Sequence, residues 1–289
     1  MFEARRNEYA RLTQACLDEA MAPMGDGIVA QGMRYASAGG KRIRGFLAME
    51  SAALFGIEPV QSVWAAAAVE AMHAYSLVHD DMPCMDDDDL RRGLPTVHVK
   101  WGEAAAVLVG DGLQALSFEL LTREDLCADA SVRIALVATM ARAAGAQGMV
   151  LGQAQDIAAE EAKTPLTLEE ITELQANKTG ALIRWSAAAG ALIAGADPAP
   201  LRAFAAQLGL AFQIADDILD VEGDAALTGK RVGKDADAGK ATFVSLLGLD
   251  AARTRAQELV EGACDALAPY GDKAQALRQA ARFVISRDT

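Results

Sequence analysis

Long stretches of this chain carry apolar residues at helical spacing, and its eight prolines separate many of these stretches. Few segments show the strict alternation of apolar and polar residues that marks a half-buried strand. We expect helices over residues 3–21, 26–37, 41–55, 60–81, 102–121, 130–158, 167–194, 199–221, 240–268 and 272–286. The pattern therefore predicts an all-α protein.

The composition agrees with helices and gives no sign of a domain boundary. Hydrophobic residues make up 52% of the 289 positions and aromatic residues only 5%, and many of the apolar residues are the helix formers Ala and Leu. Thr167 and Glu170 are spaced as a capping box at the start of a helix. No linker, composition shift or low-complexity tract divides the chain, so we expect a single domain over residues 1–289.

Charge and hydropathy exclude several classes of protein. A net charge of −13 argues against a nucleic-acid partner, which selects for a basic surface. The longest apolar run, residues 185–196, is shorter than the roughly 18 residues that a membrane span needs, and the charged N-terminus lacks the apolar core of a signal peptide. Four scattered cysteines form no metal or disulfide pattern. We expect a cytoplasmic protein that is not embedded in a membrane, with free thiols.

Six aspartates crowd into one short segment after an apolar helix. They are Asp80, Asp81, Asp86, Asp87, Asp88 and Asp89, and Arg91 and Arg92 follow at once. Pro83 cannot lie in an undisturbed helix interior, so the helix should end or bend near Asp81. The residues after the bend can then bring Asp86 back toward Asp80, which would concentrate negative charge that needs a cation, an arginine or solvent beside it.

A second acidic motif, FQIADDILD, lies late in a strongly helical segment. Gln213, Asp216, Asp217 and Asp220 fall within an arc of about 100° on an ideal helix, and apolar residues occupy much of the remaining surface. A single pair of adjacent aspartates is usually part of a charged surface. Two such pairs, Asp80–Asp81 and Asp216–Asp217, each in an apolar helix, are better explained by a shared function. Carboxylates without companion Cys or Glu-x-x-His residues favour Mg²⁺ over zinc or a di-iron centre.

Positive charge gathers in separate clusters, which we interpret as local anion sites. The clusters are GGKRIR (residues 39–44), Arg91 with Arg92, Lys178 beside Thr179, and Lys230, Arg231, Lys234 and Lys240. Arginine suits bidentate phosphate recognition and lysine adds a point charge. For any single lysine, a surface salt bridge is the more common explanation.

Two further features have two interpretations each. His73 lies two helical turns before Asp80, and it is either an ordinary helical histidine or a ligand. Residues 222–239 fit a lid and an ordinary solvated loop equally well.

Four of these motifs together resemble the trans-type (all-E) polyprenyl diphosphate synthases. They are GGKRIR, DDMPCMDDDDLRRG, KTGALI and FQIADDILD, and the match spans at least Gly39 to Lys240. The resemblance implies an all-α bundle around a deep cavity and a homodimer. One departure is Gly45, where the family usually has proline.

The resemblance also implies a role for each motif residue. Asp80, Asp86 and Asp216 would bind Mg²⁺, with Asp81, Asp217 and Asp220 in support. Arg91, Lys178, Gln213 and Lys230 would contact an allylic diphosphate. Lys41, Arg44, His73 and Arg92 would bind isopentenyl diphosphate, and Thr179 and Lys240 complete the predicted substrate set. Asp80, Asp216, Lys178 and Thr179 form the predicted catalytic group, whereas Asp87, Asp88 and Asp89 receive no role.

The same resemblance predicts the reaction and its product. Mg²⁺-assisted ionisation of dimethylallyl or geranyl diphosphate, followed by attack of isopentenyl diphosphate, would lengthen the prenyl chain. Tyr75, five positions before the first aspartate and followed by Ser76, indicates a farnesyl (C15) product. The alternatives are a geranylgeranyl or geranyl diphosphate synthase, a terpene cyclase, and a non-catalytic partner subunit with a decayed site.

Overall fold

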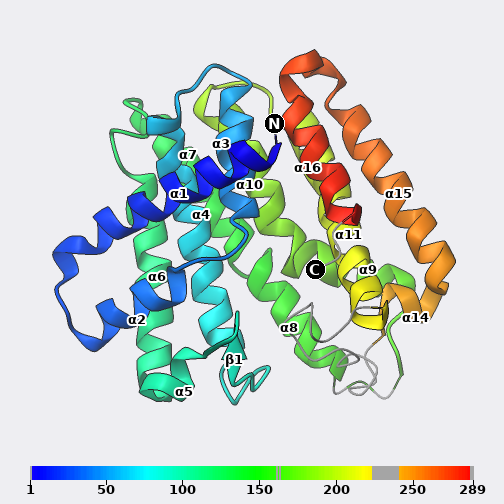
Figure 1. The fold of residues 1–289 in the computed structure, drawn as a ribbon, viewed down its shortest axis with the longest axis horizontal. Helices are drawn as coiled ribbons and strands as arrows, with labels where there is room; N and C mark the ends of the chain where they lie inside the picture. Colours follow the sequence, from blue (N-terminus) through cyan, green and yellow to red (C-terminus); the bar gives the residue numbers. More distant parts are fainter. Residues whose placement is uncertain (1, 161, 163, 223–240, 287–289) are drawn as a thin grey trace. The chain divides into compact units, whose positions relative to one another are not determined.

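The computed structural model describes residues 2–160, 162, 164–222 and 241–286, and nearly all of its regular structure is helical (Figure 1). The helices are α1 (Phe2–Met21), α2 (Ile28–Ser37), α3 (Ile43–Ala53), α4 (Pro59–Asp80), α5 (Val97–Trp101), α6 (Glu103–Leu121), α7 (Ala130–Ala144), α8 (Met149–Glu160), α9 (Leu168–Lys178), α10 (Gly180–Ile193), α11 (Ala199–Glu222), α14 (Phe243–Leu247), α15 (Leu249–Ala266) and α16 (Gln275–Ser286). Short 3-10 helices occupy Ala22–Met24 and Ala268–Ala274. The predicted all-α fold is confirmed.

Three of the predictions were wrong in the extent of the helix. In each case the structure has two helices where the sequence predicted one. The helix predicted over 130–158 is broken into α7 and α8, where the backbone at Gly148 comes so close to the Ala143 carbonyl that a side chain could not fit. The helix predicted over 167–194 breaks at Thr179. Within the described part of 240–268, Gly248 adopts φ 80° and separates α14 from α15, a conformation that favours glycine.

The aspartate-rich segment continues into a small hairpin that the helical pattern did not predict. Strands β1 (Leu90–Arg91) and β2 (Leu94–Pro95) pair antiparallel. The two turn residues, Arg92 and Gly93, have φ of 55° and 75°, and positive φ at both positions is the requirement of a type I′ hairpin turn. The hairpin therefore holds Arg91 and Arg92 in a defined geometry directly after the aspartates.

One compact unit contains residues 3–140 and 189–196, and α4 lies at its centre. Helix α4 packs against α2, α3 and α6, and α4 and α6 run side by side in Figure 1. The run Ala65–Ala68 is fully buried. Small side chains let neighbouring helices approach closely, so the alanine-rich sequence of α4 suits its central position. Pro59 starts the helix at the position where its missing N–H is not needed.

The other compact unit contains residues 141–188 and 197–289, as far as these are described, and is built on α11. Helix α11 packs against α9, α14, α15 and α16, and α8 packs against α9. The apolar side of α11 buries Phe204, Leu208 and Ile214. The capping box predicted at the start of α9 is confirmed, because Thr167 and Glu170 each accept a hydrogen bond from the other's backbone N–H.

Two segments among the described residues are long and apolar enough on average to be considered as membrane spans. Polar residues interrupt both, so no uninterrupted apolar run in either reaches the length of a span. The segments are Glu103–Leu121, half of whose apolar window is buried, and Ala130–Glu160, of which 28% is buried. The first is α6, which packs against α4. The second consists of α7 and α8, with 15 and 12 residues, and each is shorter than the roughly 20 residues that cross a bilayer.

Candidate functional site

The aspartate-rich segment folds back on the end of α4. The helix ends at Asp80, and the N–H of Asp86 donates to the Asp80 carbonyl at 2.8 Å. The N–H of Asp88 donates to the Asp81 carbonyl at 3.2 Å in the same way. The predicted return of Asp86 to Asp80 is confirmed, and its cause is the turn that begins where Pro83 prevents the helix from continuing.

Asp81 is the buried member of this segment, and its partner is Arg91. Arg91 Nε donates to Asp81 Oδ1 at 2.9 Å, Nη2 donates to the same oxygen, and Asp88 Oδ2 lies 3.5 Å from Nη2. Burial of the guanidinium disfavours its charge, but the hydrogen bond and the negative charge of Asp81 outweigh burial and raise the pKa of Arg91. Asp88, which had no predicted role, thus helps to hold Arg91.

A cluster of positive charge surrounds His73 on α4. Burial lowers the pKa of His73 well below its usual value, and the nearby arginines, Arg44 and Arg92 foremost, lower it further. The imidazole is therefore neutral at pH 7, so it can donate a hydrogen bond without adding to the charge. Burial and the charge of Arg42 likewise lower the pKa of Arg92. Cations held this close together repel one another, which is the electrostatic condition of an anion site.

The loop between α2 and α3 contacts the hairpin at Ala38 and Gly40. Gly39 and Gly40 have φ of 69° and 87°. A Cβ placed on Gly40 would lie 2.8 Å from the central carbon of the Arg92 guanidinium, and Arg92 Nη1 donates to the Ala38 carbonyl at 2.8 Å. The Arg92 side chain therefore lies directly against the backbone at Gly40. It brings the GGKRIR loop and the RRG hairpin into one arrangement.

Tyr75 lies one turn before His79 on the side of α4 that faces α6. The two rings meet edge to face with centroids 5.1 Å apart, and His79 Nε2 donates to the Val107 carbonyl at 3.1 Å. A side chain at Gly110 would overlap the His79 ring. Burial, together with the charge of Asp80, raises the pKa of Tyr75. Tyr75 thus contacts His79, whose position requires a glycine on α6.

The second acidic motif lies on α11, and Asp217 is its buried member. Asp217 Oδ2 accepts a hydrogen bond from the N–H of Phe243 at 2.8 Å, which caps the start of α14. Asp217 Oδ1 accepts from Gln213 Nε2 at 3.3 Å, and Gln213 Oε1 accepts from the Thr179 hydroxyl at 3.4 Å. One hydrogen-bonded chain therefore joins the end of α9, the acidic side of α11 and the start of α14.

Lys178 ends α9 and forms an ion pair that the sequence did not indicate. Its Nζ lies 2.5 Å from Asp156 Oδ2 on α8. Gly152 makes the pair possible, because a side chain there would overlap the backbone of Lys178. In the sequence, Asp156 is only an acidic residue in an apolar helix, one turn after Gly152. This arrangement is too common to indicate a functional residue.

A polar hollow of about 450 Å³ lies beside this ion pair. Among its lining residues are Asp156, Gln175, Lys178, Thr179, Gln213, Asp217 and Thr242. Gln175 was also missed from the sequence, and its Oε1 is buried without a hydrogen-bond partner among the residues that the structure describes. A buried acceptor that lacks a partner beside a lysine is consistent with a hollow that holds a polar ligand.

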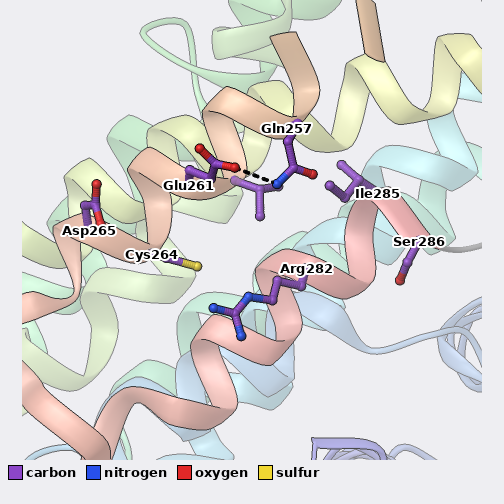
Figure 2. A pocket seen from close by; sticks show the side chains of 8 residues that line it. Gln257, Glu261, Cys264, Asp265, Arg282, Ile285 and Ser286 are labelled. Carbon is purple, nitrogen blue, oxygen red and sulfur yellow. Dashed lines mark hydrogen bonds between the residues drawn. The ribbon is translucent and has the colours of Figure 1, made fainter. Parts of the chain in front are cut away.

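Another hollow, of about 680 Å³, lies between α15 and α16 (Figure 2). Glu261, Cys264 and Asp265 line one side and Arg282 lies on the other. None of the residues predicted for substrate or metal lines it. The larger volume therefore does not make it the better candidate for the chemistry that the motifs indicate.

The predicted metal ligands are all carboxylate oxygens, which suit a hard cation such as Mg²⁺. Among the described residues no group of three or more acidic, histidine or cysteine side chains forms a complete metal site. Asp80, Asp81 and Asp86 belong to one compact unit, whereas Asp216, Asp217 and Asp220 belong to the other. The combined ligand set stays a prediction. Lys230 and Lys240 lie outside the described residues.

Comparison with known proteins identifies the family. A model of the polyprenyl synthetase family matches residues 27–279. The chain belongs to this family. It is 46% identical over 271 residues to the farnesyl diphosphate synthase of Escherichia coli K12, a match that covers 90% of this chain and 89% of that protein. The resemblance read from the four motifs is confirmed.

Further relatives extend the comparison to structure and to other products. A solved apo structure of an FPP/GFPP synthase from Zymomonas mobilis superposes with a TM-score of 0.89 at 43% identity, over 98% of both chains. Geranylgeranyl pyrophosphate synthase 4 of Arabidopsis thaliana is 38% identical over 285 residues, covering 96% of this chain and 76% of that protein. The farnesyl-type relative is thus more similar to this chain than the geranylgeranyl-type relative.

Proposed function

We propose that this protein is a farnesyl diphosphate synthase, which condenses isopentenyl diphosphate with dimethylallyl and then geranyl diphosphate. The observation that carries the proposal is the pairing of acidic and basic side chains in both motif regions: Asp81 with Arg91, and Asp156 with Lys178. An acidic protein that retains both aspartate motifs beside ordered cations has the groups needed to bind diphosphates and Mg²⁺. Its family membership selects the reaction.

The two diphosphates would bind to different sets of residues. Arg91, Lys178, Gln213 and Lys230, with Thr179 and Lys240, would contact the allylic diphosphate. Lys41, Arg44, His73 and Arg92 would hold isopentenyl diphosphate, and the cationic cluster around His73 supports this assignment. Neutral His73 would donate one hydrogen bond to a phosphate oxygen, while the arginines supply charge and bidentate contacts.

Asp80, Asp86 and Asp216 would hold Mg²⁺ directly, with Asp220 in support. The buried carboxylates Asp81 and Asp217 already accept hydrogen bonds from Arg91 and from the N–H of Phe243. These two would therefore act by orienting their neighbours. Bound Mg²⁺ would neutralise charge on the diphosphate that leaves.

In the reaction the allylic carbon–oxygen bond breaks, and its electron pair leaves with the diphosphate. The isopentenyl double bond supplies the electron pair of the new carbon–carbon bond, and loss of a proton to the departing diphosphate restores a double bond. Lys178 and Arg91 stabilise the leaving group more strongly as its negative charge grows. Asp156 and Asp81 hold those cations in place beforehand, which limits reorganisation during the reaction.

Tyr75 supports a product of 15 carbons. Its ring contacts His79 and its side chain hydrogen-bonds to Gln114, while His79 donates to the Val107 carbonyl and occupies the space at Gly110. A ring packed in this way would block further growth of the prenyl chain. A flexible side chain at the same position could move aside and let the chain lengthen. Geranylgeranyl or geranyl diphosphate synthase activity is the alternative, and a non-catalytic partner subunit is a weaker one because both aspartate motifs are intact.

Substitution of Tyr75 tests the length assignment. Tyr75→Ala should shift the main product from C15 to C20 or longer, since the ring no longer limits the chain. Tyr75→Phe keeps the ring and should leave the C15 product unchanged. Both variants are to be compared by chromatography of the dephosphorylated products. A C15 product from Tyr75→Ala would show that another residue limits the chain.

The remaining assignments concern organisation and location. We infer one functional domain over residues 1–289, supported by a family match that runs from residue 27 to 279 across residues of both compact units. We infer a homodimer in the cytoplasm. The exposed side chains of Val107 and Leu108 on α6 supply apolar surface that a second copy would cover.

Release of inorganic diphosphate tests the proposed reaction. Purified protein with Mg²⁺, isopentenyl diphosphate and dimethylallyl diphosphate should release diphosphate, and omission of either substrate or addition of EDTA should abolish release. The double variant Asp80→Asn, Asp216→Asn should be inactive, whereas Asp87→Asn should retain activity because Asp87 has no assigned role. No diphosphate release by the wild-type protein would overturn the proposal.

A further inference from the structure

A buried glutamate on α4, Glu70, has no part in the proposed mechanism. Only 4% of its surface is exposed. Its Oε1 accepts a hydrogen bond from the N–H of Gly45 at 2.8 Å, and its Oε2 lies 3.4 Å from Arg42 Nη1. A buried carboxylate is costly unless it is paired and hydrogen-bonded. Glu70 satisfies this condition with two partners at the start of α3, the N-cap Arg42 and Gly45 in the first turn.

Arg42 shows how strongly the start of α3 is constrained. It has φ 50°, a left-handed conformation that residues other than glycine rarely adopt, and it stands at the N-cap of α3. Its buried guanidinium also donates to the Ser37 carbonyl and, at 2.5 Å, to Gln14 Oε1. The side chain thus joins α1, the end of α2 and α4, and this surrounding structure keeps the backbone in its unusual conformation.

Each of the two partners of Glu70 is next in sequence to a cation of the GGKRIR segment. Arg42 directly follows Lys41, and Gly45 directly follows Arg44, so each tied residue is the immediate neighbour of one of these two cations. Glu70 is also an acid among several cations. Its negative charge raises the pKa of Arg92, whereas the positive charges of Arg42 and Arg91 lower it. One carboxylate therefore affects both the backbone at the start of α3 and the repulsion that Arg92 experiences from Arg42 and Arg91.

We propose that Glu70 is the positioning residue of the isopentenyl diphosphate site, and that it sets the geometry of Lys41 and Arg44 by holding Arg42 and the N–H of Gly45. The inference rests on the proposed function through the assignment of Lys41 and Arg44 to that substrate. It gives Gly45 a physical role: proline, which the family resemblance leads one to expect there, has no N–H to donate. A Cβ at Gly45 would also lie 3.3 Å from Glu70 Cγ and 3.4 Å from Thr13 Oγ1.

Steady-state kinetics of Glu70→Gln test the inference. The amide keeps the size of the side chain and can still accept from Gly45, but it loses the charge that holds Arg42. We expect KM for isopentenyl diphosphate to rise about tenfold, as for loss of a charge-assisted hydrogen bond, with KM for geranyl diphosphate within about twofold of wild type. A rise of both KM values by the same factor, or a fall of kcat alone, would contradict the proposal.

Glu50→Gln is the matched control. Glu50 is equally buried in the same compact unit, on α3, and its partner is Arg5 on α1, away from the GGKRIR loop. If buried glutamates act only by stabilising the fold, both variants should lower Tm and leave the ratio of the two KM values unchanged. The proposal requires that Glu70→Gln alone change this ratio.

A double-mutant cycle and a milder variant keep the test decisive. In an Arg42→Gln background, Glu70→Gln should change KM for isopentenyl diphosphate by less than threefold, because its partner is already absent; full additivity would contradict the inference. If Glu70→Gln does not fold, Gly45→Ala should raise the same KM a few-fold by displacing Glu70, and an unchanged value would contradict it. An inactive wild-type protein would instead refute the proposed function.

Discussion

Aspartates that look alike in the sequence have different surroundings in the structure. Asp81 and Asp217 are buried and accept hydrogen bonds from Arg91 and from the backbone of α14, whereas Asp86 and Asp87 are exposed. Burial therefore separates the aspartates that orient neighbours from those that can reach a cation in solution. Each buried acid has a defined partner, so its removal should affect that partner first.

Asp81→Asn should destabilise the protein and impair substrate binding together. Removing one member of a buried ion pair leaves the other charge uncompensated; because Arg91 is partly exposed, we expect a loss of about 2 kcal/mol in the free energy of unfolding. Urea denaturation of Asp81→Asn and Asp87→Asn measures this, with Asp87→Asn within about 0.5 kcal/mol of wild type. Equal stability of the two variants would show that the Arg91 pair contributes nothing.

His73 should make stability depend on pH in a predictable direction. Its pKa is lowered in the folded state, so the unfolded chain binds more protons below the ordinary histidine value of about 6.5. Its contribution is fully present above that pH and is lost as the pH falls. Between pH 7.5 and pH 5, His73→Gln should therefore lose less stability than wild type.

Thermal denaturation of the wild-type protein and of His73→Gln across this pH range checks the effect. A His73→Gln curve parallel to that of wild type would mean that the imidazole is not kept neutral by the fold.

Some of these residues could be predicted from sequence, and others could not, for a physical reason. The return of Asp86 to Asp80 follows from Pro83, which is a local effect of covalent geometry. Asp156 and Glu70 act through partners 22 and 25 or more positions away. No local pattern encodes such a contact, because it arises only when two helices pack together.

Helices show the same division between local and tertiary causes. Apolar periodicity predicted the helical segments, but it continued across the breaks at Gly148 and Gly248. A short turn between two helices can leave the apolar side of both helices facing the core, so the pattern shows no interruption there. Glycine is permissive in many settings, so its presence alone did not locate those breaks. The Arg92–Gly93 turn was likewise missed, because a two-residue strand is too short to show alternation.

The contact between α4 and α6 depends on a glycine. A side chain at Gly110 would overlap the His79 ring, which is held by the Val107 carbonyl. Gly110→Ala should therefore lower the free energy of unfolding by about 1–3 kcal/mol, as for other overpacked sites. It should also displace Tyr75, which contacts His79.

Gly112→Ala provides the comparison on the same helix. A Cβ there would meet the sulfur of Met33 at 2.8 Å, and a flexible methionine can move away at little cost. Urea denaturation should therefore rank Gly110→Ala as the less stable variant. The reverse order would mean that His79 is not fixed against α6.

Each compact unit carries part of the predicted site. One contains the GGKRIR loop, His73, the first aspartate motif and the RRG hairpin, and the other contains Lys178 and the second aspartate motif. The family match extends through both. The proposed function requires both sets of residues, because an allylic diphosphate must be ionised and an isopentenyl group must be present to react.

The most direct test of the proposed function is the length of the product. Wild-type protein incubated with Mg²⁺, dimethylallyl diphosphate and radiolabelled isopentenyl diphosphate should convert the label mainly into farnesyl diphosphate, identified by chromatography after dephosphorylation. A main product of 20 carbons would contradict the farnesyl assignment. The absence of any lengthened prenyl diphosphate would contradict the proposed function itself.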